Sequence, residues 1–116
     1  MPGLRNEFSR ETKDLWFWRR YCSRCARGDR GLELDHIVGR SENSAYAAYQ
    51  NCRPCHSKKG GYDDKKRRLK YTFHYLQNNN YAPNKKDIDF LKRHIDMYDE
   101  LSDDVLRLVE KFDSNE

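Results

Sequence analysis

Two short cysteine pairs, CSRC at Cys22–Cys25 and CRPC at Cys52–Cys55, enclose the stretch LELDHIV at 32–38 and decide the fold of this chain. The pairs use all four cysteines of the 116 residues, and 26 residues lie between them. Two Cys-x2-Cys pairs are typical of one tetrahedral zinc site with four thiolate ligands. Four sulfurs leave no coordination position for a substrate, so the predicted zinc is structural.

The composition allows only a small hydrophobic core. Hydrophobic residues make up 36% of the chain, and the mean hydropathy is -1.18. A structural metal contributes most to stability where the core is small. No apolar run approaches the ~20 residues that span a bilayer, and the N-terminus lacks the apolar stretch of a signal peptide. We therefore expect a cytoplasmic protein with no membrane partner, where such cysteine pairs favour a metal. Disulfides are the alternative.

The net charge of +4 is unevenly distributed along the chain. Residues 1–70 carry 17 Lys and Arg against 9 Asp and Glu, a net +8, whereas residues 71–116 carry 6 against 10, a net -4. The basic part contains the cysteine and histidine motifs. A positive field around a metal site suits a polyanion, with nucleic acid as the leading candidate. A solvated basic surface that keeps the protein soluble is the alternative.

Local patterns predict mostly helices around one strand. Ser9 can cap a first helix, and its tryptophans are expected to pack in the core against the zinc knuckle, with base stacking as the alternative. Pro54 is tolerated in the first turn of a helix that follows the third cysteine. The expected elements are a helix over 9–20, a strand over 32–38, a strand or helical turn over 45–50, a helix from Arg53 and a helix over 63–76.

The C-terminal part is predicted to be an antiparallel helical hairpin that follows a linker over 77–83. Asn84 begins an Asn-Lys-Lys-Asp capping pattern, and Ser102 can cap the last helix. This part is acidic, so direct contact with DNA is not expected. We expect it to pack on the rest of the domain, to form a homodimer or to dock a protein partner.

Asp35, His36 and His56 are the candidate chemical groups. Hydrolysis of a phosphodiester needs a hard divalent cation and a base that activates water. Asp35 suits the cation, His56 at a helix start can supply a second ligand, and His36, with an ordinary pKa near ~6.5, can accept a proton. Neighbours on a strand point to opposite faces, so Asp35 and His36 act in different directions unless the strand bends. Local hydrogen bonding, or assistance in zinc binding, is the alternative for both histidines.

The segments CSRC, LELDHIV and NCRPCHSKK resemble the zinc-containing HNH endonucleases of the ββα-metal fold, over about residues 21–60. The resemblance implies metal-dependent cleavage of DNA phosphodiesters by nicking, and double-strand cleavage if two copies act together. It makes His36 the general base, Asp35 and His56 ligands of a catalytic Mg²⁺ or Mn²⁺, and the cysteines a structural zinc cage. The four ligands of that cage are Cys22, Cys25, Cys52 and Cys55.

The predicted fold class is thus a small α+β protein whose ββα-metal core, with an N-terminal helix, spans 1–76 and whose helical appendage spans 77–116. Lys59 matches the family lysine that contacts phosphate. The basic residues after the motif could follow a DNA backbone, or form a solvated helix face. These residues are Lys58, Lys59, Lys65, Lys66, Arg67 and Arg68. By analogy with the family, a small chain of this type suggests a phage or mobile element and the host cytoplasm. An inactive zinc-stabilised module that binds DNA or protein is the alternative function.

The chain departs from the family pattern at one position. Ala47 stands where the family has an asparagine that orients the loop around the base. Asn43 and Asn51 lie nearby but are offset, so the sequence leaves open which group has this role.

Overall fold

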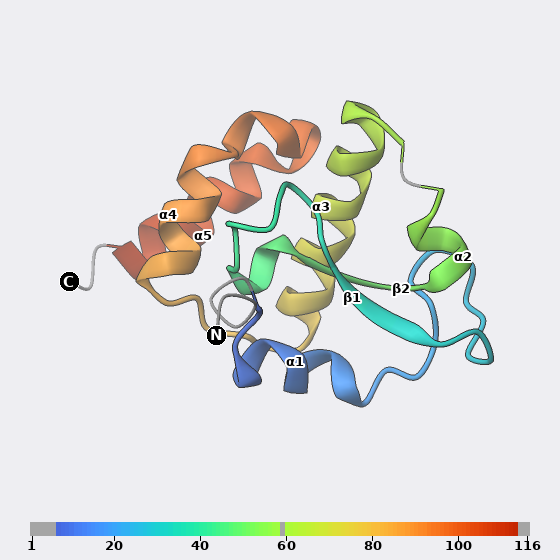
Figure 1. Cartoon of the computed structure of the whole chain (residues 1–116). Coiled ribbons are helices and arrows are strands. Elements are labelled where there is room, and N and C mark those ends of the chain that lie inside the picture. The colour runs from blue at the N-terminus through green and yellow to red at the C-terminus, as the bar shows by residue number, and fades with distance from the viewer. Residues whose placement is uncertain (1–6, 59, 114–116) are drawn as a thin grey trace.

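The computed structural model describes residues 7–58 and 60–113, and it is a small α+β structure (Figure 1). This class agrees with the prediction. The elements in order are α1 (Arg10–Phe17), β1 (Leu32–His36), the 3-10 helix η2 (Ala45–Ala47), β2 (Ala48–Cys52), α2 (Arg53–His56), α3 (Tyr62–Asn78), α4 (Lys85–Arg93), the 3-10 helix η3 (Ile95–Leu101) and α5 (Ser102–Asp113). Within the described ranges, no helix is both long and apolar enough to cross a membrane.

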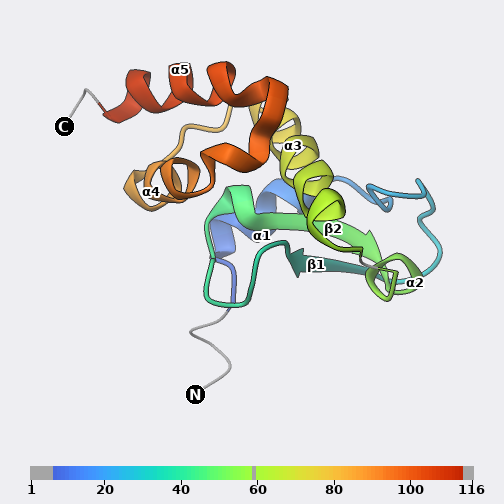
Figure 2. The ribbon, with the colours of Figure 1, turned by 90° about the horizontal axis from the view of Figure 1, so that it is seen from above.

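The sheet is an antiparallel pair of β1 and β2, with Leu32 opposite Cys52 and His36 opposite Ala48. Figure 2 shows the two strands side by side, with α2 at the end where β2 finishes. The segment 45–50, which the sequence left ambiguous, becomes the short helix η2 followed by the start of β2. The chain therefore runs strand, strand, helix from β1 to α2, and the second cysteine pair lies at the last junction.

One hydrophobic core joins the two halves of the chain. Tyr46 and Phe73, from η2 and α3, are buried in the same cluster as Phe90 and Val105, from α4 and α5. The boundary expected between 76 and 77 falls inside α3, and the core continues across it. Both views show α4 and α5 lying against each other (Figures 1 and 2). The C-terminal helices are thus built into the core.

Asp87 connects α4 to the rest of the structure through hydrogen bonds. Its carboxylate accepts hydrogen bonds from Ser44 Oγ at 2.6 Å, the Ala45 backbone N–H at 3.1 Å and Tyr81 Oη at 2.5 Å. Together with Asn84 it forms the expected capping box at the start of α4. The cap expected from Ser102 is not formed, because Ser102 is the first residue of α5 and its Oγ donates to the Ile95 carbonyl.

The two tryptophans have opposite environments. Trp16 is 1% exposed, as expected, but it stacks on Tyr75 of α3, with ring centroids 4.1 Å apart, and not on the cysteine knuckle. Trp18 is 83% exposed, so its predicted place in the core was wrong. Helix α1 ends at Phe17, and a residue two positions after Trp16 lies about 200° around the helix from it. Trp18 therefore points away from the face that Thr12 and Trp16 bury.

Candidate functional site

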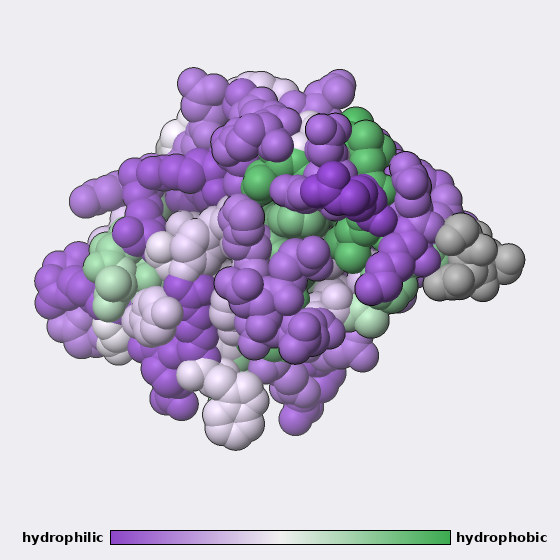
Figure 3. Space-filling model, turned by 180° about the vertical axis from the view of Figure 1, so that it is seen from behind, coloured by the Kyte–Doolittle hydropathy of each residue, from purple (hydrophilic) through white to green (hydrophobic). Residues whose placement is uncertain are grey.

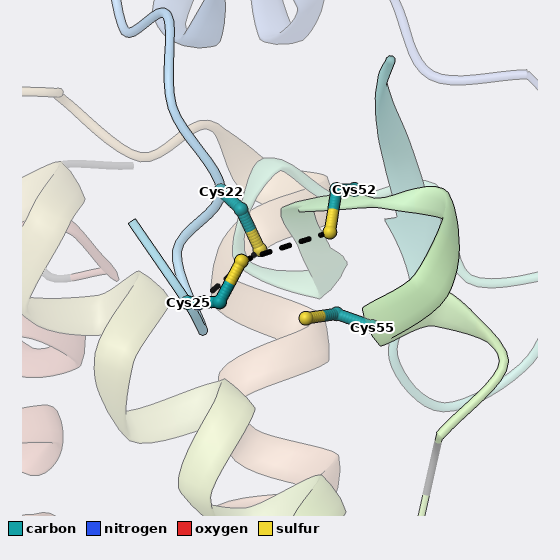
Figure 4. A group of neighbouring side chains, drawn as sticks. All are labelled: Cys22, Cys25, Cys52 and Cys55. Atoms are coloured by element: carbon teal, nitrogen blue, oxygen red, sulfur yellow. Dashed lines mark hydrogen bonds between the residues drawn. The ribbon is translucent and has the colours of Figure 1, made fainter. Parts of the chain in front are cut away.

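The four cysteines form a compact cluster (Figure 4). Their sulfur atoms all lie within 4.8 Å of one another, and the Sγ atoms of Cys25 and Cys52 are 3.7 Å apart. A tetrahedral zinc with bonds of ~2.3 Å separates its sulfur ligands by about 3.8 Å. Cys22 and Cys25 come from the loop after α1, and Cys52 and Cys55 from the junction of β2 and α2. The cluster could therefore hold a metal ion such as zinc, as the sequence indicated.

The surroundings shift the pKa values of two cysteines of the cluster in opposite directions. Burial raises the pKa of Cys22, but the N–H groups of Cys25, Cys52 and Arg24 outweigh it and lower the pKa to about 6. The N–H groups of Arg24 and Cys25 lie 3.3 and 3.4 Å from the Cys22 sulfur. Burial and the neighbouring thiols raise the pKa of Cys55 to about 12. A bound zinc would replace the remaining protons, because cysteine binds zinc as the thiolate.

Asp35 and His56 meet beside the cysteine cluster. His56 Nδ1 lies 3.4 Å from Asp35 Oδ1, and the Asp35 side chain is 6% exposed. Two adjacent ligands of an octahedral Mg²⁺ with bonds of ~2.1 Å lie about 3 Å apart, so the pair fits a shared cation. Glu33, two residues before Asp35 on β1, places Oε1 3.9 Å from His56 Nδ1. Sequence reasoning missed Glu33, although the i, i+2 spacing of the two acids places them on one face of a strand.

His36 has a different set of neighbours. Its ring stacks on Phe8, with centroids 4.1 Å apart, and its Nε2 lies 2.9 Å from Asn43 Oδ1. An amide oxygen only accepts, so this contact fits the neutral tautomer that has its proton on Nε2 and its lone pair on Nδ1. Asn43 is therefore the asparagine that contacts His36. Ala47 contacts the segment after His36 through its backbone: the Ala47 carbonyl accepts a hydrogen bond from the Ile37 N–H at 2.9 Å.

Arg68 is buried, which corrects its assignment to the DNA-binding surface. Its side chain is 3% exposed, with Nε 2.8 Å from Asp64 Oδ2 and Nη1 3.6 Å from Asp35 Oδ2. The guanidinium also lies over the ring of Tyr49, 4.7 Å from its centroid. Arg68 adjoins Leu69 on the buried face of α3, so the basic run does not form one continuous surface. The single positive charge of Arg68 is therefore shared between the carboxylates of Asp64 and Asp35.

The other predicted DNA-binding residues differ in exposure. Lys58, Lys65 and Arg67 are exposed. Arg67 forms an ion pair with Asp64. Lys66 is half-buried, and its Nζ lies 3.3 Å from Asp99 Oδ2. Lys59 lies outside the described residues. Lys65 and Arg67 are two positions apart on α3, so their exposed side chains point to different sides of the helix.

The site defines a small α+β protein with a four-cysteine cluster that could hold a metal ion, beside an acid–histidine pair. Comparison with protein-family models, with curated proteins and with solved structures finds no match for this chain. Interpretation of the site therefore rests on its own residues.

The ion pair between Asp64 and Arg68 yields a prediction about stability. Replacing Asp64 with asparagine should lower the free energy of unfolding by about 3 kcal/mol, because it leaves the buried Arg68 with less negative charge. The matched control is Asp63→Asn, since the Asp63 side chain is 98% exposed. Urea unfolding of the zinc-loaded protein at pH 7 measures both. Equal stability of the two variants would contradict the prediction.

The same ion pair sets the direction of the pH dependence. Burial raises the pKa of Asp64, but the Gly60 N–H and the guanidinium groups of Arg68 and Arg67 outweigh it and lower the pKa well below the ordinary 3.8. The carboxylate therefore stabilises the fold fully above pH 3.8, and this contribution is lost as the pH falls through the folded-state pKa.

Proposed function

We propose that this chain is a metal-dependent DNA endonuclease of the HNH type, with β1, β2 and α2 as its ββα-metal core. The observation that carries the proposal is the pair of Asp35 and His56, 3.4 Å apart, next to a separate four-cysteine cluster. The chain thus offers two unlike environments for metals. Four sulfurs suit a closed structural zinc. A carboxylate and an imidazole that is 41% exposed suit an exchangeable Mg²⁺ or Mn²⁺ with open positions.

The residues of the site would have different roles in hydrolysis. Asp35 and His56 would hold the divalent cation, which when bound supplies positive charge that stabilises the phosphate in the transition state. His36 Nδ1 would accept a proton from the attacking water. Asn43 orients the ring through its bond to Nε2. Since Asp35 and His36 alternate at the end of β1, the phosphate would bind past this strand end, where both side chains are within reach.

The surroundings support a nucleic-acid substrate. The exposed cations Lys58, Lys65 and Arg67 follow the site directly in the chain and could contact successive phosphates. Such contacts give affinity that depends on salt and carry no sequence readout. One copy has one candidate centre, so we propose nicking as the elementary reaction. Double-strand cleavage would require a second copy, which the C-terminal helices could recruit.

A zinc-stabilised binding module without catalysis is the second candidate. The observation that favours it is the separation of His36, which packs on Phe8 and Asn43, from Asp35, which adjoins His56 and Arg68. A module of this kind would bind DNA or a protein partner and would leave phosphodiesters intact. The two candidate functions therefore differ in whether the protein cleaves DNA.

Conversion of supercoiled plasmid to open circles tests the proposal. The zinc-loaded protein should nick the plasmid when Mg²⁺ or Mn²⁺ is added and not when both are omitted. His56→Ala should reduce the rate by at least about 100-fold, because it removes a metal ligand. His74→Ala is the matched control, since His74 is exposed on α3. An intact plasmid under all conditions, with one zinc per chain, would support the binding module.

A further inference from the structure

Three aromatic side chains lie exposed at the end of α1 and in the segment that joins it to the first cysteine pair. Phe17 is 58% exposed, Trp18 83% and Tyr21 44%. The rings of Phe17 and Trp18 meet edge to face, with centroids 5.3 Å apart. Most of the protein face in Figure 3 is hydrophilic. Large aromatic rings gain free energy by burial, so a cluster left in solvent marks a binding surface. We name Phe17, Trp18, Arg20 and Tyr21 the aromatic ledge.

Cations surround the aromatic ledge. Residues 17–31 contain five arginines and one aspartate, a net +4 that equals the net charge of the whole chain. The Arg20 guanidinium lies 5.8 Å from the centroid of the Phe17 ring. Arg10 and Lys13 line a surface hollow together with Phe17 and Trp18. Asp14 also lines it, 3.6 Å from Arg10. The ledge therefore presents flat aromatic faces within a positive field.

The ledge is held in place by the rest of the fold. Arg19 places its guanidinium 4.4 Å from the ring centroid of Tyr21 and 4.8 Å from that of Tyr71 on α3. The Arg19 carbonyl accepts a hydrogen bond from Gln50 Nε2 of β2. Both contacts fix the ledge to the sheet and to α3, so little conformational entropy would be lost when a ligand binds.

We propose that the aromatic ledge binds unpaired nucleotides of single-stranded DNA, with bases stacked on Trp18 and Phe17 and a phosphate paired with Arg20. Aromatic rings flanked by cations bind single strands in this way without sequence preference. Bases in a duplex are stacked on one another, so the ledge would favour single-stranded regions. A second copy of the chain is a poor occupant, because two copies of the segment 17–31, each of net +4, would repel each other.

This inference rests on the proposed function and names its substrate more closely, as DNA with a single-stranded region. Leu32 lines a second hollow together with Phe17 and Arg20. Leu32 and His36 are both on β1, four residues apart, so they lie on the same face, about 13 Å from each other.

Binding of a fluorescent oligo-dT to the zinc-loaded protein tests the proposal, in buffer without Mg²⁺, Mn²⁺ or chelator. The oligonucleotide should quench tryptophan fluorescence, since Trp18 is exposed. Trp18→Leu should weaken binding about fivefold or more and abolish most of the quenching. The same variant should bind a blunt duplex within about twofold of the wild type. Leu106→Ala, which removes another exposed apolar side chain, should bind oligo-dT with the affinity of the wild type.

Several outcomes would overturn the proposal: equal oligo-dT affinity of wild type and Trp18→Leu, an equal loss of duplex binding, or tighter binding to oligo-U than to oligo-dT. Self-association that is lost in Trp18→Leu would assign the ledge to a second copy. Binding and nicking are separable. Nicking without oligo-dT binding rejects only the ledge, whereas oligo-dT binding without nicking under any metal condition rejects only the endonuclease.

Discussion

Replacing His36 with alanine should lower the rate of plasmid nicking about 10²–10⁴-fold, the usual contribution of a general base. The reason is local. His36 ends β1, and its Nε2 faces Asn43 Oδ1 at 2.9 Å, which leaves Nδ1 to accept the proton of the attacking water. Because His36 does not contact the cysteines or Arg68 in any described hydrogen bond or ion pair, the variant should keep its zinc and its unfolding transition.

Comparison of three variants distinguishes the role of His36 as the base from the role of Asn43, which orients it. Asn43→Ala leaves the imidazole in place but removes the hydrogen bond to Nε2, so nicking should fall less than in His36→Ala, by about tenfold. His74→Ala should nick at the wild-type rate. Initial rates of open-circle formation at saturating Mg²⁺ give the comparison. A His36→Ala protein that cuts as fast as the wild type would remove His36 from the mechanism.

Removing the zinc should unfold much of the protein. Structural zinc contributes about 10–16 kcal/mol of apparent binding free energy in small zinc-dependent folds, which matches or exceeds the ~5–15 kcal/mol stability of a whole domain. Here the cluster ties the loop after α1 to the end of β2, and Cys52 is completely buried. Chelation should therefore abolish the cooperative thermal transition, and added zinc should restore it.

Substitution of single ligands sharpens this test. Cys52→Ser should lose the zinc and the cooperative transition, because the weaker oxygen ligand sits at the junction of β2 and α2. Ser57→Ala, close to the same cysteine pair but exposed, should keep both. Metal analysis and circular dichroism provide the measurements. A wild-type protein with much less than one zinc per chain, or one that melts identically after chelation, would exclude a structural zinc.

The sequence predicted the features that depend on short-range chemistry. Two Cys-x2-Cys pairs indicated the cluster, because the sulfurs of each pair are brought together by one tight knuckle. Asn84 and Asp87 indicated the capping box, which spans one helical turn. Alternation of side chains on a strand predicted that Asp35 and His36 face different ways, and their separate contacts agree with this.

Only the tertiary structure decided which side chains are buried and which distant residues meet. Arg68 reads as part of a basic run, yet it is buried and contacts the carboxylates of Asp35 and Asp64 inside the fold. Trp18 reads as core material, yet it is exposed because it lies on the side of α1 opposite to the buried Trp16. Each outcome depends on how α1 and α3 pack on the sheet. Local composition does not encode such contacts, because they form between residues far apart in the chain.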